Sequence, residues 1–126
     1  MDGNKKRILL IEDNKDAREL YEELLLKDYD VETANDGEDG LGKIRASNNY
    51  DLLILDIMMP KLDGVSLLRI KNKDSQIAKI PVVVLSNLGQ EEVLKTCFNQ
   101  GVKYYILKAE TNPDQFLSVI KQALAG

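Results

Sequence analysis

Five short apolar segments alternate with five segments of helical periodicity along the chain. The apolar segments are RILLI (7–11), DVETA (30–34), LLILD (52–56), PVVVLS (81–86) and YYILK (104–108). Aliphatic and β-branched runs of this length are typical of buried strands, and the more polar second run suits a sheet edge. Parallel strands need crossover connections of a dozen or more residues, which the intervening helices supply. The pattern therefore predicts an α/β fold of the (βα)5 type, a doubly wound parallel sheet of five strands with helices on both faces.

Capping residues delimit the predicted helices. Asn14 is a suitable N-cap for the first helix, and Asn112 with Pro113 opens the last one. Gly101 suits the C-terminal cap of the fourth helix, 91–101, and the third helix is expected at about 65–72. The second helix contains Gly40 and Gly42, each of which costs about 1 kcal/mol relative to alanine. It is therefore predicted to be the weakest of the five.

Two helices have clear apolar faces. The first is expected to turn one face toward the sheet: Ala17, Leu20, Tyr21, Leu24 and Leu25. The fourth is expected to turn four residues inward: Val93, Leu94, Cys97 and Phe98. Cys97 is interpreted as core packing rather than as a redox group.

Composition excludes several classes of function. The 126 residues fit one domain, so residues 1–126 are predicted to form a single domain with no output domain attached. No apolar run approaches the roughly 20 residues of a membrane span, and the N-terminus lacks the apolar centre of a secretion signal, so the expected location is cytoplasmic. With no histidine and one cysteine, a Cys/His zinc site and an internal disulfide are excluded. The net charge of -4, with scattered cations, argues against direct nucleic-acid binding.

Polar residues follow the predicted strands at one end. Glu12 and Asp13 follow the first strand, Asp56 ends the third, Ser86 the fourth and Lys108 the fifth. The carboxyl ends of parallel strands meet at one edge of a sheet, where ligands bind in open α/β folds. Taken singly, each residue could serve as a turn, a cap or a solvated charge. Together they predict a shared site.

Three carboxylates in one site repel one another, by about 3 kcal/mol per pair at a separation of ~5 Å and an effective dielectric constant of ~20. A hard divalent cation offsets this repulsion, and Mg²⁺ suits a site with few carboxylates and room for water or phosphate oxygens. A carboxylate beside such an ion can act as a nucleophile toward a phosphoryl group, while Lys108 neutralises the developing oxygen charge.

Four motifs, LLIEDN, LLILDIMMPKLDG, VVVLSN and YYILK, stand in this order along the chain. As a set they resemble the response-regulator receiver domain of two-component signalling (the CheY-like family). The resemblance covers essentially the whole chain. It implies a flavodoxin-like three-layer sandwich with strand order 2-1-3-4-5.

The resemblance also implies roles for individual residues. Asp56 would be the phosphoacceptor, and Ser86 and Lys108 would contact the phosphoryl group. Ser86 and Tyr105 would form the switch. The implied Mg²⁺ ligands are Glu12, Asp13, Asp56 and the backbone carbonyl of Met58. Pro60 and Gly64 match the loop that follows the phosphoacceptor.

The expected function is a phosphorylation-dependent switch in a two-component phosphorelay. A sensor histidine kinase or phosphotransfer protein would supply the phosphoryl group to this phosphoprotein. The surface formed by the fourth helix, the fifth strand and the last helix would then change and regulate a downstream protein target. The chain is not expected to be an enzyme beyond self-phosphorylation from a phosphodonor and autodephosphorylation.

Two positions depart from the family pattern. Asn87 stands where the family prefers a small residue, and we expect it to slow exchange of the phosphoryl group. Ala109 stands where proline commonly follows the lysine, so the loop KAETNP is expected to be strained or differently shaped.

Two alternatives remain. One is a receiver-like docking module that is not phosphorylated. The other, an aspartate-nucleophile phosphatase of the haloacid-dehalogenase type, is disfavoured because its motif needs a second aspartate where this chain has Met58.

Overall fold

The structure is a computed structural model that describes residues 5–47, 49–87 and 89–125. The described residues form one five-stranded parallel sheet in the order β2-β1-β3-β4-β5. The strands are β1 (Arg7–Ile11), β2 (Asp30–Ala34), β3 (Leu52–Leu55), β4 (Val82–Ser86) and β5 (Tyr104–Leu107). The predicted flavodoxin-like fold and strand order are confirmed. After β2 the chain passes over β1 and continues with β3 on the other side of β1, so the strand order reverses between β1 and β3.

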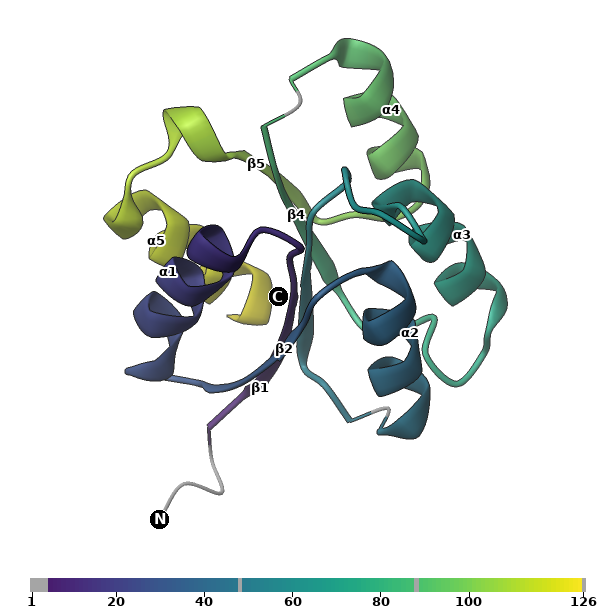
Figure 1. Cartoon of the computed structure of the whole chain (residues 1–126), viewed down its shortest axis with the longest axis horizontal. Coiled ribbons are helices and arrows are strands. Elements are labelled where there is room, and N and C mark those ends of the chain that lie inside the picture. Colours follow the sequence, from purple (N-terminus) through teal and green to yellow (C-terminus); the bar gives the residue numbers. More distant parts are fainter. Residues whose placement is uncertain (1–4, 48, 88, 126) are drawn as a thin grey trace.

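Five α-helices alternate with the strands in the described part of the chain. They are α1 (Lys15–Leu26), α2 (Gly37–Ala46), α3 (Gly64–Lys73), α4 (Glu91–Asn99) and α5 (Pro113–Ala125). Helices α1 and α5 cover one face of the sheet, and α2, α3 and α4 cover the other (Figure 1). This arrangement gives the three layers that the alternating sequence predicts.

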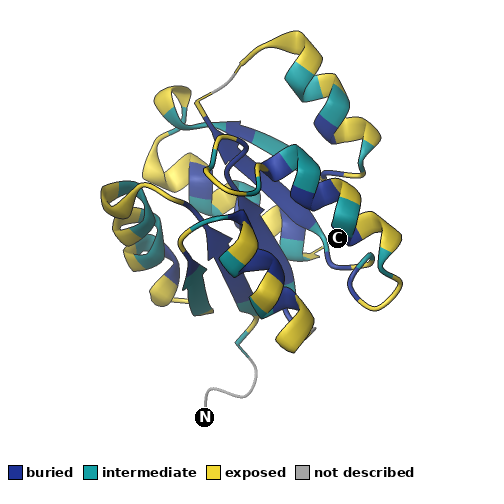
Figure 2. Cartoon of the chain, turned by 45° about the vertical axis from the view of Figure 1, so that its right-hand side comes forward, coloured by how far each residue is buried: buried dark blue, intermediate teal, exposed yellow. Residues whose placement is uncertain are grey.

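Each face of the sheet has its own hydrophobic core. Leu9, Ile11 and Leu53 face the core under α2, α3 and α4, whereas Ile8 and Leu10 face the core under α1 and α5. Successive side chains of a strand point to opposite faces, so strands with a helix layer on both sides are apolar at every position. The central strands are accordingly buried along their length, while the outer helix surfaces are exposed (Figure 2).

The predicted caps are confirmed. The side chain of Asn14 accepts a hydrogen bond from the backbone N–H of Ala17. At α5, Asn112 accepts from the N–H of Gln115, whose side chain accepts in return from the N–H of Asn112, as in a capping box. Gly101, just past the end of α4, has φ of 86°, the left-handed conformation that ends many helices.

Two predicted inward side chains are wrong. Leu20 on α1 and Phe98 on α4 are 50% and 49% exposed. Within each helix the buried residue follows a half-buried one four positions earlier: Leu25 follows Tyr21, and Cys97 follows Val93. A helix turns about 100° per residue, so Leu20, next to Tyr21, and Phe98, next to Cys97, are rotated away from the sheet.

Helix α2 forms despite Gly40 and Gly42. Close packing against β1 explains the glycine at position 40. A Cβ added there would lie 2.7 Å from Cδ1 of Ile11 on β1, so any larger residue would have to displace the Ile11 side chain. Gly42 has no heavy atom within 4 Å of an added Cβ.

The loop KAETNP after β5 begins with a short helical turn. Lys108–Glu110 form a 3₁₀ turn, and the peptide bond between Lys108 and Ala109 is trans.

Candidate functional site

The polar residues at the carboxyl ends of the strands lie together. One cavity of about 410 Å³ is lined by Glu12, Asp13, Asn14, Ala17, Asp56, Met58, Ser86, Asn87 and Lys108. Six of these lining residues are the site residues predicted from the sequence, and they come from four different strand ends. Tyr105 lies outside this cavity and lines a neighbouring pocket beside α5.

Glu12 is the most buried acid of the cluster, with 1% of its surface exposed. Its backbone N–H donates to the carbonyl of Ala34 at 3.1 Å, which continues the β1–β2 pairing past the end of the strand. Its carboxylate accepts from the N–H of Asn14 at 3.1 Å. Asp13, the next residue, is exposed at the mouth of the cavity.

Asp56 is 7% exposed and directly follows β3. Its N–H donates to the carbonyl of Ile11 at 3.1 Å, which fixes its backbone next to the end of β1. One carboxylate oxygen accepts from the N–H of Met58 at 3.2 Å. The carboxylate is therefore held in place by its own loop.

Lys108 supplies positive charge that partly offsets the charge of these acids in the structure. Its ammonium group pairs with Oε1 of Glu12 and lies 3.4 Å from Oδ2 of Asp56. The lysine therefore bridges the ends of β1, β3 and β5.

Burial and charge shift the pKa of these groups. Burial raises the pKa of the Glu12 carboxyl to about 7, the nearby Asp56 charge adds to the rise, and Lys108 opposes it. Burial alone would lower the pKa of Lys108, but its pairing with Glu12 and Asp56 outweighs that effect and raises it. Removing water thus disfavours the charge on Glu12, although an ammonium group is within reach.

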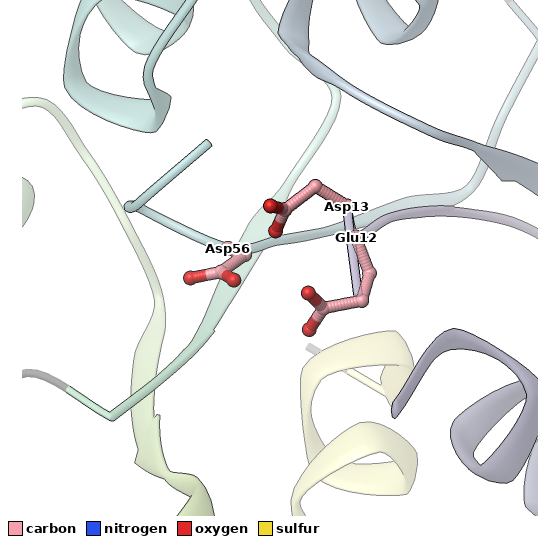
Figure 3. Close-up of side chains that lie close together, drawn as sticks. All are labelled: Glu12, Asp13 and Asp56. Carbon is pink, nitrogen blue, oxygen red and sulfur yellow. The ribbon is translucent and has the colours of Figure 1, made fainter. Parts of the chain in front are cut away.

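The three carboxylates could hold a metal ion. One oxygen from each of Glu12, Asp13 and Asp56 lies within 4.8 Å of the other two. Figure 3 shows the carboxylates gathered, two from consecutive residues after β1 and one from the end of β3. An all-oxygen donor set with one exposed member suits a hard divalent cation that keeps part of its water shell, as Mg²⁺ does.

Ser86 connects the cavity with Tyr105. Ser86 is the last residue of β4 and is buried. Burial raises the pKa of the Tyr105 hydroxyl, and a side-chain hydrogen bond with Ser86 partly offsets the rise. The two predicted switch residues are therefore in contact.

Sequence reasoning missed one supporting residue. The guanidinium of Arg18, on α1, donates to the backbone carbonyls of Glu12 at 2.9 Å and of Asp13 at 3.3 Å. It ties the acidic loop to the helix that follows it. No sequence motif predicts this contact, because Arg18 donates to backbone carbonyls rather than to particular side chains.

With the geometry established, comparison with known proteins identifies the family. The sequence matches the family described as response regulator receiver domain over residues 8–121, which is most of the chain. The chain belongs to this family. Receiver domains are typically switches rather than enzymes, and they belong to two-component signalling together with histidine kinases.

Two curated relatives illustrate the contexts of such receivers. The chain is 38% identical over 120 residues to a gliding motility regulatory protein of Myxococcus xanthus, covering 94% of this chain and 15% of that protein. It is 35% identical over 106 residues to the sensor histidine kinase TmoS of Ectopseudomonas mendocina, covering 84% of this chain and 11% of that protein. The chain thus spans a small part of the length of these two relatives.

A solved structure shares the fold. A chain of the CheX–CheY–BeF3–Mg²⁺ complex from Borrelia burgdorferi superposes with a TM-score of 0.83 at 27% identity, covering 93% of this chain and 87% of that one.

Within the described residues, the helices are too short or too polar to cross a membrane.

Proposed function

We propose that the chain is a phosphorylation-dependent switch of a two-component phosphorelay, with Asp56 as the phosphoacceptor. The observation that carries the proposal is the position of this carboxylate. It is buried at the end of β3, it is held by the N–H of Met58 and by Lys108, and it lies beside the carboxylates of Glu12 and Asp13.

The residues that would hold Mg²⁺ are Glu12, Asp13, Asp56 and the backbone carbonyl of Met58. When bound, the ion supplies positive charge beside the phosphoryl oxygens and offsets the repulsion among the acids. The matching complex from Borrelia burgdorferi contains Mg²⁺ and BeF3, which supports this assignment.

The chain's own residues would then carry the transfer. An oxygen of Asp56 attacks the phosphorus of a phosphohistidine, the new O–P bond forms as the P–N bond breaks, and the imidazole nitrogen leaves with the electron pair. Lys108, at 3.4 Å from this carboxylate, neutralises charge on the transferred oxygens. The donor is a sensor histidine kinase or a phosphotransfer protein.

The signal would leave the site through Ser86 and Tyr105. At present the Ser86 hydroxyl shares a hydrogen bond with Tyr105. A phosphoryl group adds charge and acceptor oxygens, which would draw Ser86 toward Asp56 and let Tyr105 repack. The surface of α4, β5 and α5 would change and regulate a downstream protein target.

The test is incubation with acetyl phosphate and Mg²⁺, followed by intact mass measurement. We expect one phosphoryl adduct, lost in Asp56→Asn and kept in the matched variant Asp114→Asn, whose carboxylate lies on the exposed start of α5. Absence of an adduct from the wild-type chain would favour the docking module that is not phosphorylated.

The switch has its own measurement. Beryllofluoride should shift the NMR signals of Tyr105 and α4 relative to the free protein. Unchanged signals in a chain that does accept phosphate would contradict the proposed route through Ser86.

A further inference from the structure

The loop between β3 and α3 rests against the start of α2. A Cβ added to Gly37 would lie 1.8 Å from the carbonyl oxygen of Leu62 and 2.8 Å from its Cβ, so the helix and the loop backbone are in direct contact. Beside this contact, Nζ of Lys61 lies 3.5 Å from Oδ2 of Asp36. We call Asp36, Gly37, Lys61 and Leu62 the loop brace.

The part of the loop held by the brace is strained. Lys61 has φ of 69°, in the left-handed region that lysine seldom occupies. On either side of it, the N–H of Leu62 donates to the carbonyl of Pro60 at 2.8 Å, closing a three-residue γ-turn. A γ-turn with positive φ at its centre is rare and persists only where its surroundings hold it.

Asp36 is well suited to hold the turn. Its side chain caps α2 by accepting from the N–H of Asp39 at 2.8 Å and is 15% exposed. That hydrogen bond, followed by the Lys61 ammonium, lowers the pKa of the Asp36 carboxyl. The carboxylate is thus a fixed negative charge beside the strained turn.

The other end of the same loop touches the phosphoacceptor. The N–H of Met58 donates to Asp56, and the N–H of Gly64 returns to the carbonyl of Ile57 at 2.9 Å. A Cβ on Gly64 would lie 2.6 Å from the carbonyl oxygen of Asp56, so the loop is closed tightly at its base. With its base closed, the remaining freedom of the loop lies in its middle, where the brace acts.

We propose that the loop brace positions the Met58 backbone at the carboxylate site, so that α2 tunes metal binding. Among the described residues, α2 contributes none of those that line the cavity. The brace therefore acts through the loop, and its members are positioning residues. The inference rests on the proposed function, because it assigns Met58 to the metal site.

The first test compares two glycines of the same helix. Gly37→Ala must push the Leu62 backbone away, whereas Gly42→Ala adds a methyl group to open space. We expect Gly37→Ala to raise the Mg²⁺ dissociation constant about tenfold in calorimetric titration, as loss of a supporting contact does at other metal sites. Gly42→Ala should leave it unchanged. In metal-free NMR spectra, the Met58 amide should shift in Gly37→Ala and not in Gly42→Ala.

The second test does not depend on Gly37→Ala folding. Lys61 is largely exposed, so Lys61→Ala should fold while losing the pair with Asp36. In Lys61→Ala we expect the Met58 amide signal to shift and the Mg²⁺ dissociation constant to rise about two- to threefold. In Lys61→Arg, the amide signal and the dissociation constant should return to their wild-type values.

Wild-type affinity and an unmoved Met58 amide in Lys61→Ala and in folded Gly37→Ala would overturn the inference. If the wild-type chain binds no Mg²⁺, the proposed function fails instead. The metal-free amide shift of Met58 still decides whether the brace sets the loop.

Discussion

Glu12 should make the stability of the metal-free protein fall as pH rises toward neutrality. Burial raises the pKa of its carboxyl from 4.5 to about 7, so the folded chain holds this proton more tightly than the unfolded chain. The resulting stabilisation is fully present below the unfolded pKa and is lost as pH rises through the folded pKa. The chain has no histidine, so the interval between these values is free of histidine titration.

The size of the effect follows from the two pKa values. For one carboxyl with a pKa of 4.5 unfolded and about 7 folded, linkage gives a loss of about 3 kcal/mol in the free energy of unfolding. This loss is expected as pH rises from about 4.5 to about 7.5. Mg²⁺ should abolish the slope near neutral pH, because binding to the carboxylate favours its ionised form.

Urea denaturation without metal at several pH values measures this slope. Glu12→Gln keeps the shape of the side chain but cannot ionise. The free energy of unfolding of this variant should therefore not fall between these pH values, and above pH ~7 it should be higher than that of the wild type. Glu23→Gln, on the exposed side of α1, should keep the wild-type slope. Equal slopes in wild type and Glu12→Gln would refute the reasoning.

Three further predictions concern positions around the site and in the core. Asn87 is exposed and lines the cavity, so Asn87→Ala should open access to the phosphoryl group and shorten the lifetime of the adduct severalfold; an unchanged decay in intact mass would contradict this. Gly40→Ala should lower the free energy of unfolding by about 1–3 kcal/mol through overpacking, whereas Gly42→Ala should raise it by up to about 1 kcal/mol, as denaturant titration would measure. Burial lowers the pKa of Lys71 to about 8, so the folded chain gives up this proton more readily and stability should rise between pH ~8 and ~10. Lys71→Met should remove that rise, and a rise that persists in the variant would point to another group.

The sequence was sufficient for the fold and for the gathering of the site residues. Apolar strands alternating with helices leave few topologies, and parallel strands bring their carboxyl ends to one edge. The positions of Glu12, Asp56, Ser86 and Lys108 therefore followed from where each strand ends. The caps at Asn14 and Asn112 were predictable because capping depends on neighbouring backbone atoms.

The contacts that the sequence did not predict are non-local. The bridge from Lys108 to two carboxylates depends on the direction of a long flexible side chain, and the contact of Gly37 with Leu62 joins segments 25 positions apart. From local sequence, a glycine in a helix predicts only lower helix stability. The contact with Leu62 shows that the glycine at position 37 is needed for close packing. The exposed faces of Leu20 and Phe98 were missed because periodicity gives the direction of an apolar face but not its width.

The bridge from Lys108 has a consequence for motion at the edge of the sheet. In the described structure β5 is an outer strand, and the lysine that follows it is held by acids at the ends of β1 and β3. Outer strands are where a sheet most readily frays. Separation of β5 from β4 would move the Lys108 ammonium away from the carboxylates of Glu12 and Asp56. These ion pairs therefore oppose local opening of the sheet at this edge. Amide hydrogen exchange in β5 should therefore quicken when the Lys108 charge is removed, well before the rest of the sheet responds.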